Sequence, residues 1–402
     1  MPESPHRLDV VIVGGGVAGL WLLDTLHEAG WSVLLLENSA LGGGQTIASQ
    51  GIIHGGLKYT LDGLLSPSAN AIREMPQVWR DCLAGRRAPR LTQTRVRADC
   101  CHLWRTRDWT SQVGMLGARF GLRVRPLKLP RDQWPAALRG CPGEVYRLDE
   151  PVIDCAAMIA ELAGRHAPRI LKTAPRGGIA FERRADRTDG VRISSEGGQA
   201  ARLHPDVIIL AAGAGNAELR RAAGLDAAAQ QVRPLHMVML RGALPELNGH
   251  CADGARTRVT ITTARDSAGR AVWQVGGQIA EDGVSMSPDE LVAHARRELA
   301  AVLPGVAFAH AEWSTCRADR AEAAAGGRRP SDVQIRREGD VLTVWPTKLA
   351  LAPRLAERVL RELPPAAHAA GRSQVEAALR DWPRPQGARP PWEVERSWQT
   401  WP

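Results

Sequence analysis

The chain is poor in lysine and tyrosine: its 402 residues include four lysines and two tyrosines. Lysine and arginine together number 52 against 43 acidic residues, which gives a formal net charge of +9. All of the basic residues except the four lysines are arginines. Because ammonium and guanidinium groups are not interchangeable at closely fitting sites, a lysine retained in such a chain points to a geometric requirement. The arginines are dispersed, and no basic stripe alternates with stacking aromatic residues, which argues against nucleic-acid binding.

Long apolar runs and paired cysteines are also missing. No run approaches the roughly 18 apolar residues that a bilayer-spanning helix needs. The N-terminal residues lack a charged-then-apolar leader pattern, so we expect a cytoplasmic protein, and contact with a membrane surface stays open. None of the seven cysteines forms a CxxC pair, which argues against a zinc ribbon or a thioredoxin-type centre, and we predict no metal site.

A glycine-rich turn between two apolar runs is the first motif of the chain. Residues 8–13 are apolar except for Asp9 and lead into the GxGxxG pattern of residues 14–19. A helical pattern follows, and a second apolar run, residues 31–36, ends in Glu37. The three glycines permit a tight turn, the approach of a pyrophosphate and the packing of helix on strand, and the acid accepts hydrogen bonds from a ribose diol. The unit predicts a bound dinucleotide but does not separate NAD from FAD.

A later apolar run, residues 206–215, leads into another glycine turn at Gly213. In flavoproteins with such a dinucleotide-binding unit, a late strand of this kind packs under the same dinucleotide, although any buried parallel strand has a similar pattern. The chain contains no second GxGxxG pattern, so we expect no separate nicotinamide domain. The electrons should therefore come from a substrate.

A polar, glycine-rich stretch follows Glu37. Residues 42–51 contain hydroxyl and amide side chains suited to phosphate and flavin edges, and residues 52–59 add a histidine, Lys58 and Tyr59. A plain loop is the alternative interpretation. Here the sequence resembles the FAD-dependent oxidoreductases of the D-amino acid oxidase superfamily, and most closely the flavin-dependent glycerol-3-phosphate dehydrogenases.

The resemblance rests on four segments. Residues 49–59, SQGIIHGGLKY, match a serine-to-tyrosine segment that lies against the flavin in those dehydrogenases, with Lys58 in place of their arginine. Residues 232–238, 313–320 and 346–357 resemble, in order, a strand with a substrate-facing histidine, a segment with a substrate-binding arginine, and the start of a flavin-contacting helix. The Ile-His-x-Gly-x-x-Tyr pattern is also similar to that of L-2-hydroxyglutarate-oxidising members.

One departure from the family concerns the flavin itself. Pro346 and Thr347 stand where the family has paired glycines, so we expect the backbone beside the flavin to be shaped differently. The resemblance implies a non-covalently bound FAD. The residues that we assign to it are Gly14, Gly16, Val17, Ala18, Gly19, Glu37, Asn38, Gln45, Thr46, Ser49, Gln50, Gly51, Ala174, Ala212, Gly213, Thr347, Lys348 and Leu349.

The resemblance also implies the chemistry: oxidation of a small anionic alcohol, such as a glycerol-3-phosphate-like compound or a 2-hydroxy acid, by hydride transfer to FAD. The electrons would pass to a quinone, to O2 or to a protein acceptor. An amine or amino-acid oxidase on the same scaffold is one alternative. A flavoprotein subunit that acts with a partner is another, and oligomer formation stays open.

Six residues are candidates for catalysis. His236 and His54 are the candidate bases for the hydroxyl proton, with His236 preferred because His54 could equally pack on the flavin. An anionic group could be held by Lys58, Arg317 and Lys348, with Arg320 a rival to Arg317. Tyr59 lies in the same matched segment. Cys316 resembles a flavin-bonded cysteine of monomeric sarcosine oxidases, although an ordinary thiol is the preferred interpretation.

The hydrophobic content of 44% and the length predict a globular chain of two domains or one large interleaved domain. We expect an α/β fold, α+β overall: a Rossmann-like FAD-binding domain (residues 1–85, 150–230 and 312–365) interleaved with an antiparallel-sheet substrate domain (residues 86–149 and 231–311). Residues 366–402 form a tail rich in proline and tryptophan. Because exposed tryptophans are unfavourable, the tail should dock on its own chain, on a second subunit or on a membrane, its own chain being preferred.

Overall fold

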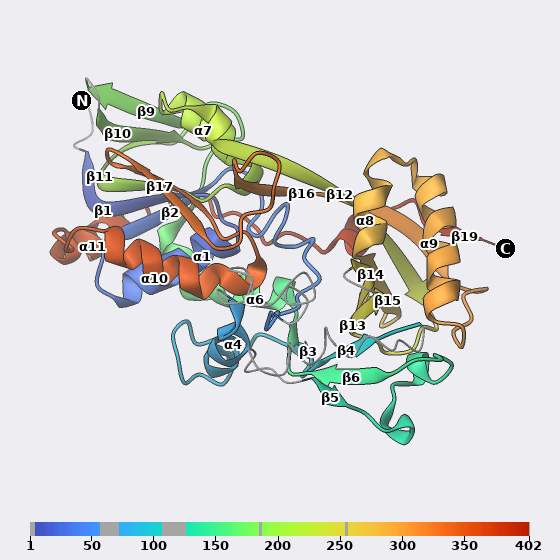
Figure 1. Cartoon of the computed structure of the whole chain (residues 1–402). Helices are drawn as coiled ribbons and strands as arrows, with labels where there is room; N and C mark the ends of the chain where they lie inside the picture. Colours follow the sequence, from blue (N-terminus) through green and yellow to red (C-terminus); the bar gives the residue numbers. More distant parts are fainter. Residues whose placement is uncertain (1–4, 57–71, 107–125, 185–186, 254–255, 402) are drawn as a thin grey trace.

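The computed structural model describes residues 5–56, 72–106, 126–184, 187–253 and 256–401. Two β-sheets form two bodies that lie side by side, as Figure 1 shows. The chain passes between these bodies several times, so neither is a continuous segment. A Rossmann-like sheet interleaved with an antiparallel sheet was the predicted architecture, and it is confirmed.

The first sheet contains the glycine motif. Its strands, in spatial order, are β17 (Gln334–Glu338), β18 (Val341–Trp345), β11 (Ala200–Leu210), β1 (His6–Val13), β2 (Val33–Glu37) and β8 (Ile170–Lys172). The four strands from β11 to β8 run parallel, as does β18, and a hairpin of β9 (Ile179–Arg184) and β10 (Arg187–Ser194) extends β11. The predicted late strand, β11, lies directly beside β1, with Leu210 opposite Val13.

Helices cover this sheet on both faces, because its central strand is apolar on both. In β1, Val10 and Ile12 belong to one buried cluster and Val11 and Val13 to another, which follows from the two-residue period of a strand. The surrounding helices are α1 (Val17–Glu28), α4 (Met75–Leu83), α6 (Cys155–Arg165), α7 (Asn216–Ala222), α10 (Ala352–Glu362) and α11 (Arg372–Ala378).

The second sheet is mostly antiparallel and has nine strands among the residues that the structure describes. Their spatial order is β19 (Gln399–Thr400), β16 (Glu312–Ala323), β12 (Gln230–Gly242), β15 (Ala271–Gly276), β14 (Arg256–Arg265), β13 (Gly249–Asp253), β4 (Cys101–Trp104), β6 (Val145–Leu148) and β5 (Leu127–Lys128). A further pair, β3 (Val96–Ala98) and β7 (Val152–Ile153), lies outside it.

One predicted domain boundary differs from the structure. The sequence placed residues 312–323 with the FAD-binding domain, but β16 pairs with β12 from Gln230↔Ala323 to Arg241↔Glu312. The two long strands reach from the first body into the second in Figure 1. Backbone pairing therefore assigns β16 to the second sheet, a register that no local sequence pattern reveals.

A short helix, α8 (Gln278–Asp282), and a longer one, α9 (Pro288–Val302), lie against this sheet. A capping box begins α9, because the Ser287 hydroxyl accepts from the amide of Glu290 and the Glu290 carboxylate accepts from the amide of Ser287. Among the described residues, we find no helix that is both long and apolar enough to cross a membrane.

The C-terminal segment packs on its own chain. Trp382 and Trp392 are buried, one beside the first sheet and the other beside the second, and β19 pairs with β16. Arg241 stacks over Trp398, with the guanidinium carbon 4.2 Å from the ring centroid. Of the three surfaces considered for this tail, its own chain is the one that it contacts in the structure.

Candidate active site

A cavity of about 620 Å³, called cavity 1 below, opens where β1 ends and α1 begins. Gly14, with a φ of +112°, makes the turn between them. A side chain on this residue would collide with Ala212, because an ideal Cβ on Gly14 would lie 2.5 Å from the Cα of Ala212. Only glycine fits both requirements. The N-terminal amides of α1 line this space and favour a negatively charged group.

The carboxylate of Glu37 stands at one end of cavity 1. Its Oε2 accepts from the amide of Gly15 at 2.7 Å, and its Oε1 accepts from the amide of Ser39 at 2.8 Å. A carboxylate oxygen accepts more than one hydrogen bond, so this orientation leaves acceptor capacity toward the cavity. The arrangement fits a ribose diol beside Glu37 and a pyrophosphate at the start of α1.

Most of the residues assigned to the cofactor line cavity 1. Three do not. Gly19 packs helix on strand, Gln50 lines a second cavity and donates to the carbonyls of Thr260 and Gln274, and the Gly51 carbonyl accepts from the amide of Ile153. The remainder, all in the wall of cavity 1, are Gly14, Gly16, Val17, Ala18, Glu37, Asn38, Gln45, Thr46, Ser49, Ala174, Ala212, Gly213, Thr347, Lys348 and Leu349.

Cavity 2, of about 370 Å³, adjoins the first. The residues that line both cavities are Gln45, Ser49, Ala318, Thr347, Lys348 and Leu349. A dinucleotide in cavity 1 whose reactive ring reaches this shared wall would face a small molecule in cavity 2. The second cavity lies between the two sheets. Part of its lining comes from β12, β14, β16 and α8 of the second body, and part from residues 45–54 and 347–350, which follow β2 and β18 of the first sheet.

His54 lines cavity 2 with a buried carboxylate behind it. Glu150 is 1% exposed, its Oε1 accepts from the amide of Gly55 at 2.6 Å, and its Oε2 lies 3.6 Å from His54 Nδ1. Backbone pairing of residues 51–53 with residues 151–153 brings the two side chains together. The ring of His250 lies beside that of His54, with the centroids 5.4 Å apart.

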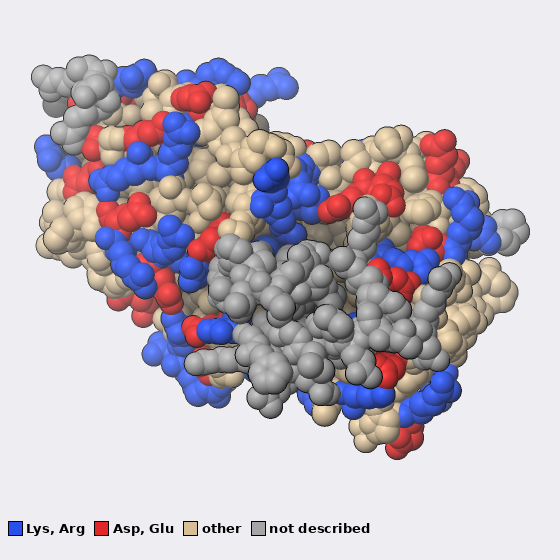
Figure 2. Space-filling model, in the orientation of Figure 1, with Lys and Arg blue, Asp and Glu red and all other residues tan. Residues whose placement is uncertain are grey.

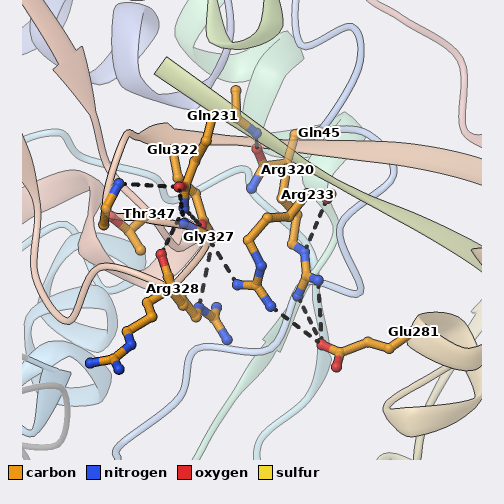
Figure 3. Close-up of polar contacts among 12 residues, drawn as sticks. Gln45, Gln231, Arg233, Glu281, Arg320, Glu322, Gly327, Arg328 and Thr347 are labelled. Atoms are coloured by element: carbon orange, nitrogen blue, oxygen red, sulfur yellow. Dashed lines mark hydrogen bonds and ion pairs between the residues drawn. The ribbon is translucent and has the colours of Figure 1, made fainter. Parts of the chain in front are cut away.

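A cluster of arginines closes the other part of cavity 2 (Figure 3). Arg320, from β16, donates through Nη1 and Nη2 to Glu281 of α8, both at 3.3 Å. Arg233 lies 3.5 Å from the buried carboxylate of Glu322, and Arg329 lies 4.0 Å from it. Three guanidiniums thus face two carboxylates.

Arg320 is the most buried arginine of this cluster, and its pKa is affected by the excess of positive charge around it. Burial, and after it the neighbouring Arg233 and Arg329 guanidiniums, lower the pKa of Arg320 from its usual value. An arginine nevertheless stays protonated near neutral pH. Arg320, Arg329 and Lys348 line cavity 2 together with one acid, Glu281, so its wall carries a net positive charge that suits a small anion.

His236 does not line either cavity. It is 2% exposed, its Nδ1 is 3.0 Å from the carbonyl oxygen of Gly283, and burial lowers its pKa. Its neighbours Leu235 and Met237 line cavity 2 instead. Successive side chains of a strand point to opposite faces, so the predicted base is directed away from the cavity. Of the two candidate bases, the structure places His54, and not His236, in the lining of cavity 2.

Strand alternation also separates the two candidate arginines. Arg317 is exposed, reaches the edge of cavity 1 and donates to the carbonyl of Val284 at 3.2 Å. Arg320 lies three positions further along β16, an odd separation that places it on the other face, in cavity 2. Lys58 and Tyr59 lie outside the described residues.

Cys316 lines neither cavity. It packs among Met239, Val272, Trp392 and Trp398. Burial, followed by the charge of Glu395, raises the pKa of its thiol to about 12. A bond from this cysteine to a flavin in cavity 1 has no support in the structure.

Glu150, Arg329 and Glu281 were not singled out in the sequence. Arg329 follows a Gly-Gly pair in a loop after a strand, a weak signal that many plain loops share. Glu150 contacts Gly55, which is 95 positions away, so no local pattern could have revealed the contact. Among the described residues on the face shown in Figure 2, basic and acidic side chains are interspersed and form no basic stripe.

The fold and cavities are those of a flavoprotein oxidoreductase, and comparison with known proteins shows the family. The model of the family described as "FAD dependent oxidoreductase" (DAO) matches residues 9–340, and the chain belongs to this family of enzymes. Its cofactor is FAD. The matched range contains all the residues that line the two cavities except those between residues 344 and 350.

The chain is 40% identical over 400 residues to the "Probable FAD-dependent oxidoreductase PA4991" of Pseudomonas aeruginosa, covering 98% of this chain and 99% of that protein. The crystal structure of that protein superposes with a TM-score of 0.80, at 38% identity over 98% of this chain and 99% of that one. More distant structures show the fold alone. They include a glycine oxidase from Geobacillus kaustophilus (17% identity, TM-score 0.62, 91% and 98% coverage) and a glycerol-3-phosphate dehydrogenase from Bacillus halodurans complexed with FAD (14%, 0.56, 92% and 68%).

Proposed function

We propose that the protein oxidises a small alcohol that carries an anionic group, such as a 2-hydroxy acid or a polyol phosphate. The observation that carries the proposal is the lining of cavity 2, which combines an imidazole backed by a buried carboxylate with a cluster of cations. Both stand beside a wall shared with cavity 1. The bound FAD supplies the acceptor for the hydride that leaves the substrate carbon.

The residues of the chain would divide the remaining work. Arg320 and Arg329 bind the anionic group, which orients the substrate in cavity 2. His54 accepts the hydroxyl proton, and Glu150 orients the imidazole. Lys348, 5% exposed in the shared wall, lies where the reacting end of the substrate would be.

His54 distinguishes this proposal from its nearest rival, oxidation of an amine or amino acid. An alcohol has a hydroxyl proton that must be removed, and a base within the cavity serves that step. A neutral amine can be oxidised without such a base. The cationic wall supports either substrate, because both classes include small carboxylates.

The experiment is a matched substrate screen with the holoenzyme. Each 2-hydroxy acid is paired with the amino acid of the same carbon skeleton, polyol phosphates are added, and bleaching of the flavin band is followed without oxygen. We expect hydroxy acids or polyol phosphates to bleach the flavin and their amino counterparts not to. Bleaching by the amino acids alone contradicts the proposal. Readmitting O2, or adding a quinone, then separates the candidate electron acceptors.

A further inference from the structure

The segment of residues 382–400 connects the two bodies of the protein on the outside. At one end, the indole of Trp382 donates from Nε1 to the carbonyl of Lys172 at 2.8 Å. At the other end, Trp392 is 4% exposed and packs on Met239 and Val272 of the second sheet. The segment is therefore fixed on both sides of its central part.

That central part pairs with the loop after β2. The amide of Leu41 donates to the carbonyl of Gln386 at 2.8 Å, and the amide of Ala388 donates to the carbonyl of Leu41 at 2.8 Å. Leu41 and Gly387 form a parallel β-bridge between them. We call residues 386–388 the C-terminal latch.

Leu41 transmits this contact to the wall of cavity 1. It is 2% exposed and lies so close to Gly15 that an ideal Cβ on that glycine would be 2.4 Å from Leu41 Cδ2. The amide of Gly42 donates to the carbonyl of Gly15 at 2.8 Å, and the amide of Gly15 donates to Glu37. The latch therefore supports the loop that holds Glu37 and Gly15 in place.

We infer that the C-terminal latch is a cofactor-retaining device: it keeps residues 38–46 against Gly15 and so slows the release of FAD from cavity 1. The residues on both sides of Leu41, from Glu37 to Ala40 and from Gly43 to Thr46, line that cavity. FAD cannot leave past this wall unless the loop moves, and the latch opposes that motion. The inference does not depend on which substrate the enzyme oxidises.

The composition of the segment suits this role. Pro383, Pro385, Pro390 and Pro391 flank the latch, and proline fixes φ and limits the conformations that a free segment would gain. Little entropy is then recovered when the latch detaches, which favours the attached state. The docking of the tail on its own chain would then serve to retain the cofactor, in addition to burying apolar side chains.

Ala388→Pro is the sharpest test, because it removes the amide that donates to Leu41. The preceding residue, Gly387, has no Cβ to collide with the proline ring. Ala388→Ser, which keeps the amide, is the matched control. We expect holoenzyme carrying Ala388→Pro to release flavin roughly two- to tenfold faster than wild type, as the loss of one hydrogen bond implies, and Ala388→Ser to release it at the wild-type rate.

Release is measured as the rise of flavin fluorescence after dilution of the holoenzyme, with no substrate present. Two truncations extend the test: a chain ending at Pro385 lacks the latch, and a chain ending at Glu395 keeps it but lacks β19. We expect fast release from the first and wild-type release from the second. Wild-type release from Ala388→Pro, or equal rates from the two truncations, overturns the inference. If the shorter chain does not fold, Ala388→Pro decides alone.

Discussion

Thr347 adopts a φ of +65°, the one positive value at a non-glycine residue in the part of the chain that the structure describes. This conformation favours glycine and costs a β-branched residue roughly 1–3 kcal/mol. The Thr347 hydroxyl donates to the carbonyl of Asp332 at 2.9 Å, and Asp332 is held by Arg354 through two contacts of 2.7 Å. The sequence predicted a differently shaped backbone here. The structure instead shows a glycine-like one, held by hydrogen bonds in the wall that both cavities share.

His54 and His236 give a paired prediction about the base. His54→Gln should lower the rate constant of flavin reduction by a factor of about 10²–10⁴, because a positioned base contributes that much to proton transfer. His236→Gln should leave it within about twofold, since its ring lies outside both cavities. Stopped-flow reduction without oxygen, using the best substrate of the screen, measures both. The reverse ranking would restore His236 as the base.

Arg320 and Arg317 give a second pair, on one strand but on opposite faces. Arg320→Met should lower kcat/KM for an anionic substrate by roughly 10- to 100-fold, mainly through KM, because a charge-assisted hydrogen bond is lost. Arg317→Met removes the same charge outside cavity 2 and serves as the control. Steady-state kinetics separates kcat from KM. Equal losses in both variants would show that overall charge, not the Arg320 contact, governs binding.

At the scale of elements, the contact between β1 and α1 depends on Gly19. An ideal Cβ at this position would lie 1.9 Å from the carbonyl oxygen of Gly14, so Gly19→Ala forces the helix away from the turn. We expect a loss of unfolding free energy of about 1–3 kcal/mol, as overpacking generally causes, together with weaker FAD binding. Chemical denaturation and flavin titration measure the two effects.

Gly164→Ala is the matched control for that prediction. Gly164 lies in α6, is exposed, and has no atom within 4 Å of an ideal Cβ. Alanine there should raise the free energy of unfolding by about 0.5–1 kcal/mol, because glycine lowers helix stability by that amount. If both variants lost stability equally, the close approach at Gly19 would not be the cause of its effect.

The elements also show what the sequence could predict. The strand, turn, helix and acid around Gly14 were predictable because the signal is local and each residue type has a distinct task. The sequence could not predict which face of β12 points to a cavity. His236 and Met237 are neighbours and both are buried, so polarity alone does not show which of them faces the cavity. The pairing of Glu150 with His54 arises from strand neighbours far apart in sequence, and the extended tail has no periodicity to interpret.

At the scale of the molecule, the two sheets are joined by continuous strands and by the C-terminal segment. β12 and β16 pair along their whole length, and the segment after Trp382 crosses from the first sheet to the second. Cavity 2 lies between these bodies, so its shape depends on their mutual placement. Because the strands of the two bodies are interleaved along the chain, residues from seven separate stretches converge on cavity 2.

The formal charge of +9 can now be connected to that cavity. An anionic substrate approaches a positively charged protein whose cavity wall carries Arg320, Arg329 and Lys348, and such a field raises the rate of encounter and the affinity. Raising the ionic strength from about 0.01 M to about 0.15 M shortens the screening length from about 30 Å to about 8 Å. We therefore expect kcat/KM for the anionic substrate to fall several-fold over this range.

The control for this salt dependence is a neutral amide or ester of the same compound, whose kcat/KM should change little. Arg320→Met should show a shallower dependence than wild type, because one of the attracting charges in the cavity wall is gone. A kcat/KM that stays constant or rises with salt for the anionic substrate would contradict the assignment of this arginine cluster to substrate binding. In that case the cluster would serve to hold α8 against β16 through Glu281, which is the other task that its contacts can perform.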